Sequence, residues 1–174
     1  MQRRLSHGGN RETPLEYSEL RQLPYSAALF NETLRLYPPI IFLIRESIKA
    51  DSILGSSCPA GAMVAISPWV IQRHEQNWEH PNEFRPERFL ADLATVAEKQ
   101  LESDAFLPFG IGPRKCPGAA FAMQEAILVL AEMVRNYEIL PDQDHTPDLV
   151  GRLTLRSRNG VKVRLAPRRQ ESLG

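Results

Sequence analysis

The segment Phe106–Gly118, FLPFGIGPRKCPG, combines a cysteine with glycines, prolines and two cationic residues, a composition that suits the binding of a ligand. It contains Cys116, one of only two cysteines, which follows Arg114 and Lys115 and precedes an apolar segment. A cysteine just before a helix meets free backbone N–H groups and the positive end of the helix dipole, and both favour a thiolate. The two cationic side chains suit an anionic group of a cofactor. We therefore interpret Cys116 as a candidate ligand.

The other residues of this loop make room around the sulfur. Gly110 and Gly112 permit a tight bend before it, and Pro117 suits the first turn of a helix. Gly118 lacks a side chain where something flat and bulky could approach the backbone. Phe109 can shield the sulfur from water, which tunes the potential of a bound metal.

Three other roles for this cysteine stay open at this point. A zinc site needs several ligands at short spacing, whereas Cys58 is far away and the histidines are scattered at 7, 74, 80 and 145. A nucleophile needs a histidine base, which only folding could supply. A buried, inert thiol is the common role of a single cysteine. Cys58 lies in a predicted turn between two strands, without positive neighbours or a following helix, so we do not expect it to be a ligand.

The spacing around the sulfur is specific. The pattern Phe109-x-x-Gly112-x-Arg114-x-Cys116-x-Gly118 resembles the haem-thiolate signature of the cytochrome P-450 family at all five fixed positions. Five defined residues over ten positions are a far stronger signal than a lone glycine pattern.

Two further motifs stand in the order that this family shows. Glu32-x-x-Arg35 precedes a double proline, and Pro86–Phe89 reads PERF. Alone, a glutamate and an arginine at i, i+3 are usually a solvated pair worth a few tenths of a kcal/mol, roughly. The resemblance implies instead that Glu32 and Arg35 join Arg88 in a buried structural network beneath the cysteine loop, because bidentate bonds let a buried carboxylate stay charged between two guanidinium groups.

The resemblance implies that Cys116 is the proximal thiolate ligand of the iron of haem b. The thiolate pushes electron density to the iron and favours O–O cleavage, so the implied activity is that of a monooxygenase, an oxidoreductase that oxygenates an organic substrate. Arg114 is the candidate partner of a haem propionate. Arg45 is a second one, the alternative being an ordinary charge at a strand edge. The remaining candidate cofactor-binding residues are Phe109, Gly112 and Gly118.

The resemblance also implies partners. A separate reductase or ferredoxin supplies electrons, so that NAD(P)H acts only indirectly, and the substrate is a small, apolar organic molecule. Candidate substrate contacts lie after the first helix and near the C-terminus, although both groups could equally be ordinary core: Ile40, Ile41, Phe42, Leu153 and Thr154.

Two predicted helices position these residues. The first covers Pro24–Leu36, and the second runs from about Ala119 to Tyr137, with its polar residues in one narrow stripe, so that most of its surface should be buried. Strands are expected over 40–50 and 62–67, and a hairpin over 152–165 around Asn159-Gly160. These elements predict a mainly α (α+β) fold with small sheets, and the resemblance implies that it is the C-terminal part of the cytochrome P-450 domain, with the cysteine loop and the long helix that follows it.

The rest of the chain is expected to be less regular. Residues 1–13 read as a loose end, 14–20 as a short helix, 68–88 as packed coil, 91–102 as an exposed turn or insertion, and 168–174 as a tail. Residues 14–167 are expected to form an incomplete domain. The part of the chain that resembles the family corresponds to less than half of the family's domain and does not include the distal half of the haem pocket.

Composition narrows the classes of function further. The 174-residue chain has 21 basic and 21 acidic residues, so its formal net charge is zero. The sequence contains no basic tract with interleaved aromatic residues, the pattern that would indicate nucleic-acid binding. Two cysteines cannot form a disulfide scaffold. No signal peptide or membrane span is visible, so a cytoplasmic location is expected.

Two alternatives to a monooxygenase stay open. One is a haem enzyme of the same fold that acts as an isomerase or peroxygenase, although such relatives often alter the cysteine loop. The other is an inactive haem-binding remnant, which the missing distal half favours. For the monooxygenase itself, we expect the isolated 174-residue chain to be inactive, because the resemblance covers only the proximal side of the haem pocket.

Overall fold

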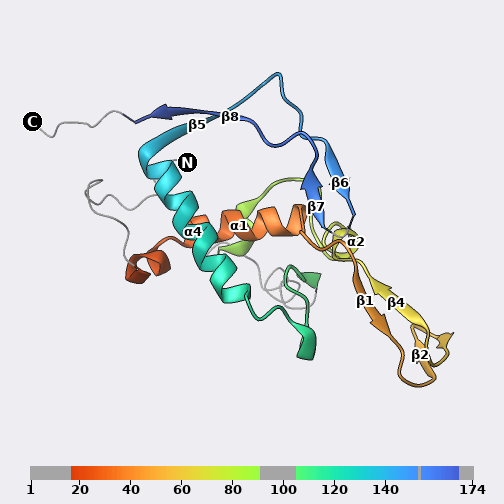
Figure 1. Ribbon diagram of the computed structural model, residues 1–174. Coiled ribbons are helices and arrows are strands. Elements are labelled where there is room, and N and C mark those ends of the chain that lie inside the picture. The colour runs from red at the N-terminus through yellow and green to blue at the C-terminus, as the bar shows by residue number, and fades with distance from the viewer. Residues whose placement is uncertain (1–16, 91–104, 153, 169–174) are drawn as a thin grey trace, which may run out of the picture.

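Two long helices, α1 (Pro24–Leu36) and α4 (Ala119–Asn136), cross at the centre of the structure (Figure 1). The computed structural model describes residues 17–90, 105–152 and 154–168. The small sheets and short helices surround this crossing, as expected for a mainly α chain with small sheets. The remaining elements are η2 (Tyr17–Gln22), β1 (Leu43–Glu46), β2 (Asp51–Ile53), β3 (Ser56–Cys58), β4 (Met63–Ile66), α2 (Pro68–Ile71), η3 (Pro86–Phe89), η4 (Gly112–Arg114), β5 (Tyr137–Pro141), β6 (Leu149–Gly151), β7 (Leu155–Ser157) and β8 (Val163–Pro167).

Helix α1 has the bounds that the sequence predicts. Pro24 occupies its first turn, where a missing N–H costs nothing. The helix ends at Leu36 because the double proline Pro38-Pro39 cannot continue it. Helix α4 likewise begins at Ala119 as expected and ends at Asn136, one residue before the predicted end.

The core lies where α1 and α4 meet. Tyr25 of α1 packs against Val134 of α4, and Leu23, just before α1, packs against Ile127 and Ala131. This contact fixes the start of α4, and so the position of the cysteine loop, relative to α1.

The prediction that most of the surface of α4 is buried is wrong. The buried residues of this helix are Ile127, Ala131, Val134 and Arg135, whereas Phe121 is 70% exposed and Val129 is 51% exposed. The helix carries apolar residues on two sides, and α1 covers only one of them. The other side is open in the part of the chain that the structure describes.

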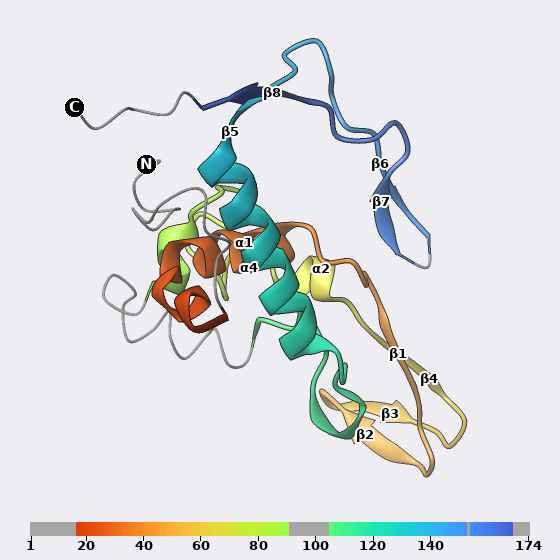
Figure 2. The ribbon, with the colours of Figure 1, turned by 60° about the vertical axis from the view of Figure 1, so that its left-hand side comes forward.

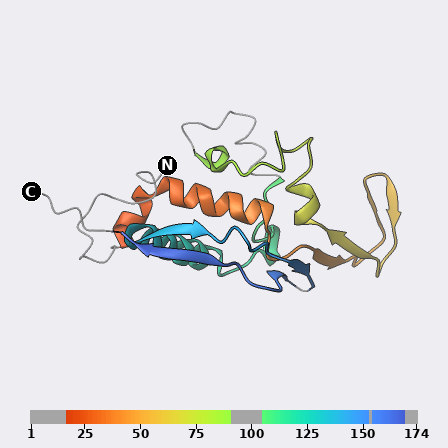
Figure 3. The ribbon, with the colours of Figure 1, turned by 90° about the horizontal axis from the view of Figure 1, so that it is seen from above.

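The segment from residue 40 to residue 67 contains four short strands, where two were expected. The strand expected over 40–50 is shorter, because β1 pairs with β4 only from Leu43↔Ile66 to Glu46↔Met63. The chain then forms a separate hairpin, β2–β3, with Asp51 opposite Cys58. Cys58 therefore lies at the end of a strand and is buried, and not in the turn where we expected it. Figures 2 and 3 show β1 and β4 extending away from the helices, with β2 and β3 connected to their far end.

The hairpin expected over 152–165 does not form. Strand β7 pairs with β6, and β8 pairs with β5, which directly follows α4. Asn159 explains why, because its side-chain Oδ1 accepts from the amide of Asp148 at 2.7 Å and its Nδ2 donates to the carbonyl of Thr146 at 3.0 Å. These bonds tie the residue to the segment before β6, so the strands on either side of it part.

Some expectations for irregular segments were refined, and others lie outside the described residues. The segment expected as coil over 68–88 contains the short helices α2 and η3. The loose end at 1–13, the first residues of the short helix expected over 14–20, the insertion at 91–102 and residues 169–174 are not described. None of the helices in the described ranges combines the length and apolarity that a membrane crossing requires.

Candidate functional site: a cysteine loop on a buried charge network

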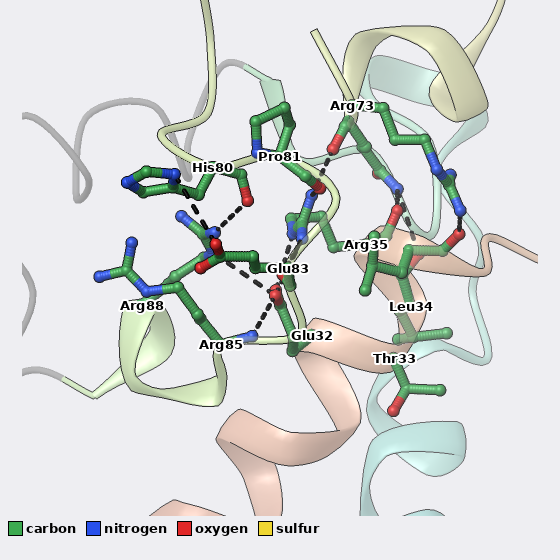
Figure 4. A network of polar contacts seen from close by, with 12 residues as sticks. Glu32, Thr33, Leu34, Arg35, Arg73, His80, Pro81, Glu83, Arg85 and Arg88 are labelled. Carbon is green, nitrogen blue, oxygen red and sulfur yellow. Dashed lines mark hydrogen bonds and ion pairs between the residues drawn. The ribbon is translucent and has the colours of Figure 1, made fainter. Parts of the chain in front are cut away.

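The buried carboxylate of Glu32 lies between two arginines, Arg35 and Arg88 (Figure 4). Glu32 and Arg35, one turn apart on α1, are both fully buried, and Arg88 of η3 is 4% exposed. Arg35 donates from Nε to Glu32 Oε2 at 2.7 Å and from Nη2 to Oε1 at 2.9 Å, a bidentate pair. Arg88 Nε donates to Glu32 Oε1 at 3.4 Å, and the amide of Arg85 donates to the same oxygen at 2.7 Å.

Other donors of the two arginines hold the irregular segment that precedes η3. Arg35 Nη1 donates to the carbonyls of Gln72 and Pro81 at 2.7 and 2.8 Å. Its Nη2 donates to the carbonyl of Glu83 at 3.1 Å, and Arg88 Nη2 donates to that of His80 at 2.9 Å. One helical side chain therefore fixes three points of a segment with little regular structure.

The pKa of Arg88 is lowered by burial and raised by its acidic partner. Desolvation lowers the pKa of its guanidinium, and the neighbouring Arg35 and Arg85 lower it too, while the charge of Glu32 raises it. A lowered pKa means that the folded chain binds this proton more weakly than the unfolded chain does, so burying the cation opposes folding. Glu32 offsets part of that cost.

An arginine at the edge of the network is held by aromatic rings. The guanidinium of Arg73 lies 3.5 Å from the ring centroid of Trp69 and 5.8 Å from that of Tyr37. It also donates to the carbonyl of Leu36, the last residue of α1. Burial and the charge of Arg35 lower its pKa.

Three aromatic rings connect the network to the start of the cysteine loop. The ring of Phe106 lies 4.9 Å from that of Phe89 and 6.4 Å from that of Trp78. The guanidinium of Arg35 lies 5.1 Å from the ring centroid of Trp78. Phe106 is therefore packed on the same segment that Arg35 and Arg88 hold.

Two of these residues, Gln72 and Trp78, were not predicted from the sequence. Both are buried, but they lie in the segment that we read as irregular coil, where no periodicity marks an inward position. A tryptophan in a polar stretch was the one available signal, since such a large ring is usually packed.

The cysteine loop bends as its glycines predict. Gly110 and Gly112 have φ values of +72° and +68°, a region that other residues adopt only with strain. The amide of Lys115 donates to the carbonyl of Gly112 at 3.0 Å, and that of Cys116 donates to the carbonyl of Phe109 at 2.9 Å. The loop thus closes on itself just before the sulfur.

The sulfur lies at the start of α4. Cys116 is exposed, and Gly118 is the N-cap residue of the helix, without a side-chain capping bond. A Cβ placed on Gly118 would lie 3.8 Å from Cys116 Sγ, so the glycine leaves open the space beside the sulfur. Arg114 is exposed in the turn that leads to it.

The loop also borders a hollow of about 680 Å³ between α1, α4 and the loop itself. Asn31 of α1 and Met123 of α4 form part of its wall, and Phe109 and Gly112 are the two residues of the cysteine pattern among those that line it.

Arg45 lies near the loop but in another hollow. Leu43, two residues earlier on β1 and so on the same face of the strand, has methyl groups 3.9 Å from the position of a Cβ on Gly110. Arg45 itself lines a hollow of about 490 Å³ together with Asp51 and Cys58. The structure therefore brings the strand of Arg45 to the cysteine loop, but it shows no contact of Arg45 with the residues around Cys116.

The two segments with candidate substrate contacts lie side by side. The amide of Leu155 donates to the carbonyl of Pro39 at 2.8 Å, and a Cβ on Gly151 would lie 2.8 Å from Ile41 Cδ1. Ile40 and Phe42 are 37% and 53% exposed. Thr154 is exposed as well, while Leu153 lies outside the described residues.

The donor atoms at this site fit one kind of metal centre. In the described ranges no three His, Cys, Asp or Glu side chains gather to hold a metal ion. Cys116 would thus be a single protein ligand, which suits a metal whose other ligands come from a prosthetic group. The open space beside its sulfur and the nearby Arg114 suit a flat group with anionic substituents.

Known proteins match nearly the whole chain. The family model "Cytochrome P450" matches residues 4–163. Cytochrome P450 4d1 of Drosophila simulans is 38% identical over 92% of this chain and 31% of its own length. Thromboxane-A synthase of Sus scrofa is 34% identical over 88% of this chain and 28% of its own length.

A solved structure confirms the fold. The cytochrome P450DA heme domain aligns with a TM-score of 0.81 at 24% identity, over 91% of this chain and 34% of that one. The chain therefore spans about a third of the length of the proteins that it matches. Because the family model covers well over half of its residues, the chain belongs to the cytochrome P450 family.

Proposed function

We propose that Cys116 is the proximal thiolate ligand of a haem b iron and that the chain is the haem-binding part of a haem-thiolate monooxygenase. Membership of the cytochrome P450 family implies a haem cofactor. The observation that carries the proposal is the exposed Cys116 sulfur at the start of α4, beside the space that Gly118 leaves open.

The residues around the sulfur have separate roles. Arg114 holds a haem propionate, and Arg45 is a second partner whose side chain has to turn from β1 toward the loop. Phe109 shields the sulfur from water, and Gly112 and Gly118 let the loop bend and the cofactor approach. Glu32, Arg35 and Arg88 act through the scaffold, because their bonds fix the segment on which Phe106 packs.

The cofactor supplies oxygen chemistry that no side chain provides: thiolate donation to iron favours O–O cleavage. A small, apolar organic substrate would meet Ile40, Ile41 and Phe42 from one segment and Thr154, with its neighbour Leu153, from the other. A reductase or ferredoxin supplies electrons, and NAD(P)H takes part only through it. The cytoplasmic location expected from the sequence stays a prediction.

The proposal is tested by comparing the two cysteines. We expect Cys116→Ala to abolish the thiolate-type absorption band of reduced, carbon monoxide-bound haem. Cys58→Ala is the matched control, because Cys58 is buried in β3, where its strand pairs with β2. The control should keep the band.

Other results of this comparison would overturn the proposal. Loss of the band in Cys58→Ala and not in Cys116→Ala would place the ligand elsewhere. Absence of any thiolate-type band from the unmodified chain, also after it is joined to the N-terminal portion of a relative, would leave an inactive remnant as the better description.

A further inference from the structure

Gln72 is a buried amide whose side chain makes three hydrogen bonds between two parts of the site. Its side chain is fully buried. Nε2 donates to the carbonyls of Leu34 at 3.1 Å and Arg35 at 2.9 Å, in the last turn of α1. Oε1 accepts from the amide of Leu107 at 2.7 Å, just before the cysteine loop bends. One side chain thus joins the end of α1 to the entrance of the loop.

The bonds continue from Leu107 to the sulfur-bearing residue. The carbonyl of Leu107 accepts from the amide of Gly110 at 3.2 Å, and the carbonyl of Phe109 accepts from the amide of Cys116 at 2.9 Å. Backbone hydrogen bonds therefore close the loop at both ends, and the Gln72 side chain fixes Leu107 relative to α1.

The backbone around Gln72 is fixed as well. Its carbonyl accepts from Arg35 Nη1 at 2.7 Å, which ties it to the network around Glu32. Its amide donates to the carbonyl of Pro68 at 2.9 Å, because Gln72 ends helix α2. At the start of α2, the Ser67 hydroxyl donates to the carbonyl of Ile41 at 3.0 Å. The side chain therefore starts from a backbone that cannot shift without breaking several bonds.

We propose that Gln72 is a positioning residue that sets the cysteine loop, and through it the Cys116 sulfur, against α1. This inference rests on the proposed role of Cys116 as haem ligand. An amide suits the task because it offers two N–H donors to the helix-end carbonyls and an oxygen to the loop. A carboxylate could accept from Leu107 but could not donate to the two carbonyls, and a thioether could do neither.

The first experiment needs no cofactor. Amide hydrogen exchange of Leu107 is measured in the haem-free chain and in Gln72→Met, which keeps the side-chain length but removes its three bonds. The control is Gln76→Met, the same substitution at an exposed position of the same segment. We expect protection of Leu107 to fall about tenfold in Gln72→Met, the effect of losing one hydrogen bond of typical strength, and to be unchanged in the control. Unchanged protection in Gln72→Met would overturn the inference.

A conservative variant separates two effects of Gln72: the hydrogen bond that its Oε1 accepts from Leu107 and its contribution to the stability of the whole chain. Gln72→Glu keeps an oxygen for the Leu107 amide while losing the bonds to Leu34 and Arg35. We expect it to be less stable than the unmodified chain but to protect Leu107 more than Gln72→Met does. Equal loss of Leu107 protection in both variants would show that the side-chain oxygen does not hold the loop. If Gln72→Met fails to fold, Gln72→Glu is compared with the unmodified chain alone, and a loss of Leu107 protection as large as about tenfold would overturn the inference.

The second experiment reads the position of the sulfur. In reduced, carbon monoxide-bound samples, we expect the share of bound haem with the thiolate-type band to fall in Gln72→Met and to stay unchanged in Gln76→Met. A residue with a merely structural role would lower the amount of loaded protein but not this share. If Cys116→Ala kept the band, the proposed function would fail. If Cys116→Ala lost it while Gln72→Met kept the full share, only the inference about Gln72 would fail.

Discussion

At the level of single residues, the Glu32 carboxylate compensates the positive charges of two buried arginines. Arg35 and Arg88 both donate to it, and all three side chains are almost completely removed from water. A pair of this kind contributes little compared with a well-packed apolar cluster, but removing one partner leaves buried charges without compensation. The burial that lowers the pKa of Arg88 would then act without its main opposing charge.

We therefore predict that Glu32→Gln lowers the free energy of unfolding by about 3–5 kcal/mol. Urea denaturation of the unmodified and variant chains measures the difference. Glu79→Gln is the control, because Glu79 pairs with Arg85 at 3.4 Å on the surface, where an ion pair contributes about 0–1 kcal/mol. Similar, small losses in both variants would contradict the buried-network interpretation.

At the scale of elements, the site depends on contacts between segments that carry little structure of their own. The segment after α1 is held by β6 and β7 through the bond from Leu155 to Pro39 and through the approach of Gly151 to Ile41. Strand β6 can come this close because Gly151 has no side chain. The two groups of candidate substrate contacts are thereby kept together.

This packing predicts an interaction between two substitutions. Gly151→Ala places a Cβ 2.8 Å from Ile41 Cδ1, so we expect a loss of about 1 kcal/mol in the free energy of unfolding, at the low end for overpacking. Ile41→Val removes that methyl group and should restore most of the loss in the double variant. Ile44→Val, at a half-exposed isoleucine of β1, is the control and should not. Additive effects for Gly151→Ala and Ile41→Val, measured by urea denaturation, would refute the contact.

At the scale of the whole molecule, α4 has one covered side and one open side. Helix α1 and Leu23, which directly precedes it, cover Ile127, Ala131 and Val134, while Phe121, Leu128 and Val129 are exposed. The chain spans about a third of the length of its relatives. An open apolar side of this kind favours self-association.

We predict that the isolated chain self-associates, takes up haem weakly and forms no product with a reductase. Joining it to the N-terminal portion of a relative should restore haem uptake and turnover. Sedimentation and product analysis measure these properties. Replacing Phe121 and Val129 by Ser should reduce self-association, whereas Val161→Ser, at an exposed valine outside α4, should not. Efficient, reductase-dependent hydroxylation by the 174-residue chain would contradict the prediction.

Features that depend on neighbouring residues could be predicted from the amino-acid sequence. The bounds of α1 follow from Pro24 and the double proline, and the bend before Cys116 follows from Gly110 and Gly112, because proline and glycine restrict or free the backbone locally. The pattern from Phe109 to Gly118 identified the family for the same reason, since its residues act within one loop.

Which distant segments meet could not be predicted from local patterns, because it depends on how the helices pack. Asn159-Gly160 has the sequence of a tight hairpin, yet the bonds of Asn159 to the segment before β6 give each flanking strand a different partner. Gln72 carries no periodic signal, and its role appears only when α1 and the start of the cysteine loop lie on either side of it. A polar side chain can form hydrogen bonds with many different groups. Its actual partners are those that the packed helices bring within reach, and these come from segments that are distant in the sequence.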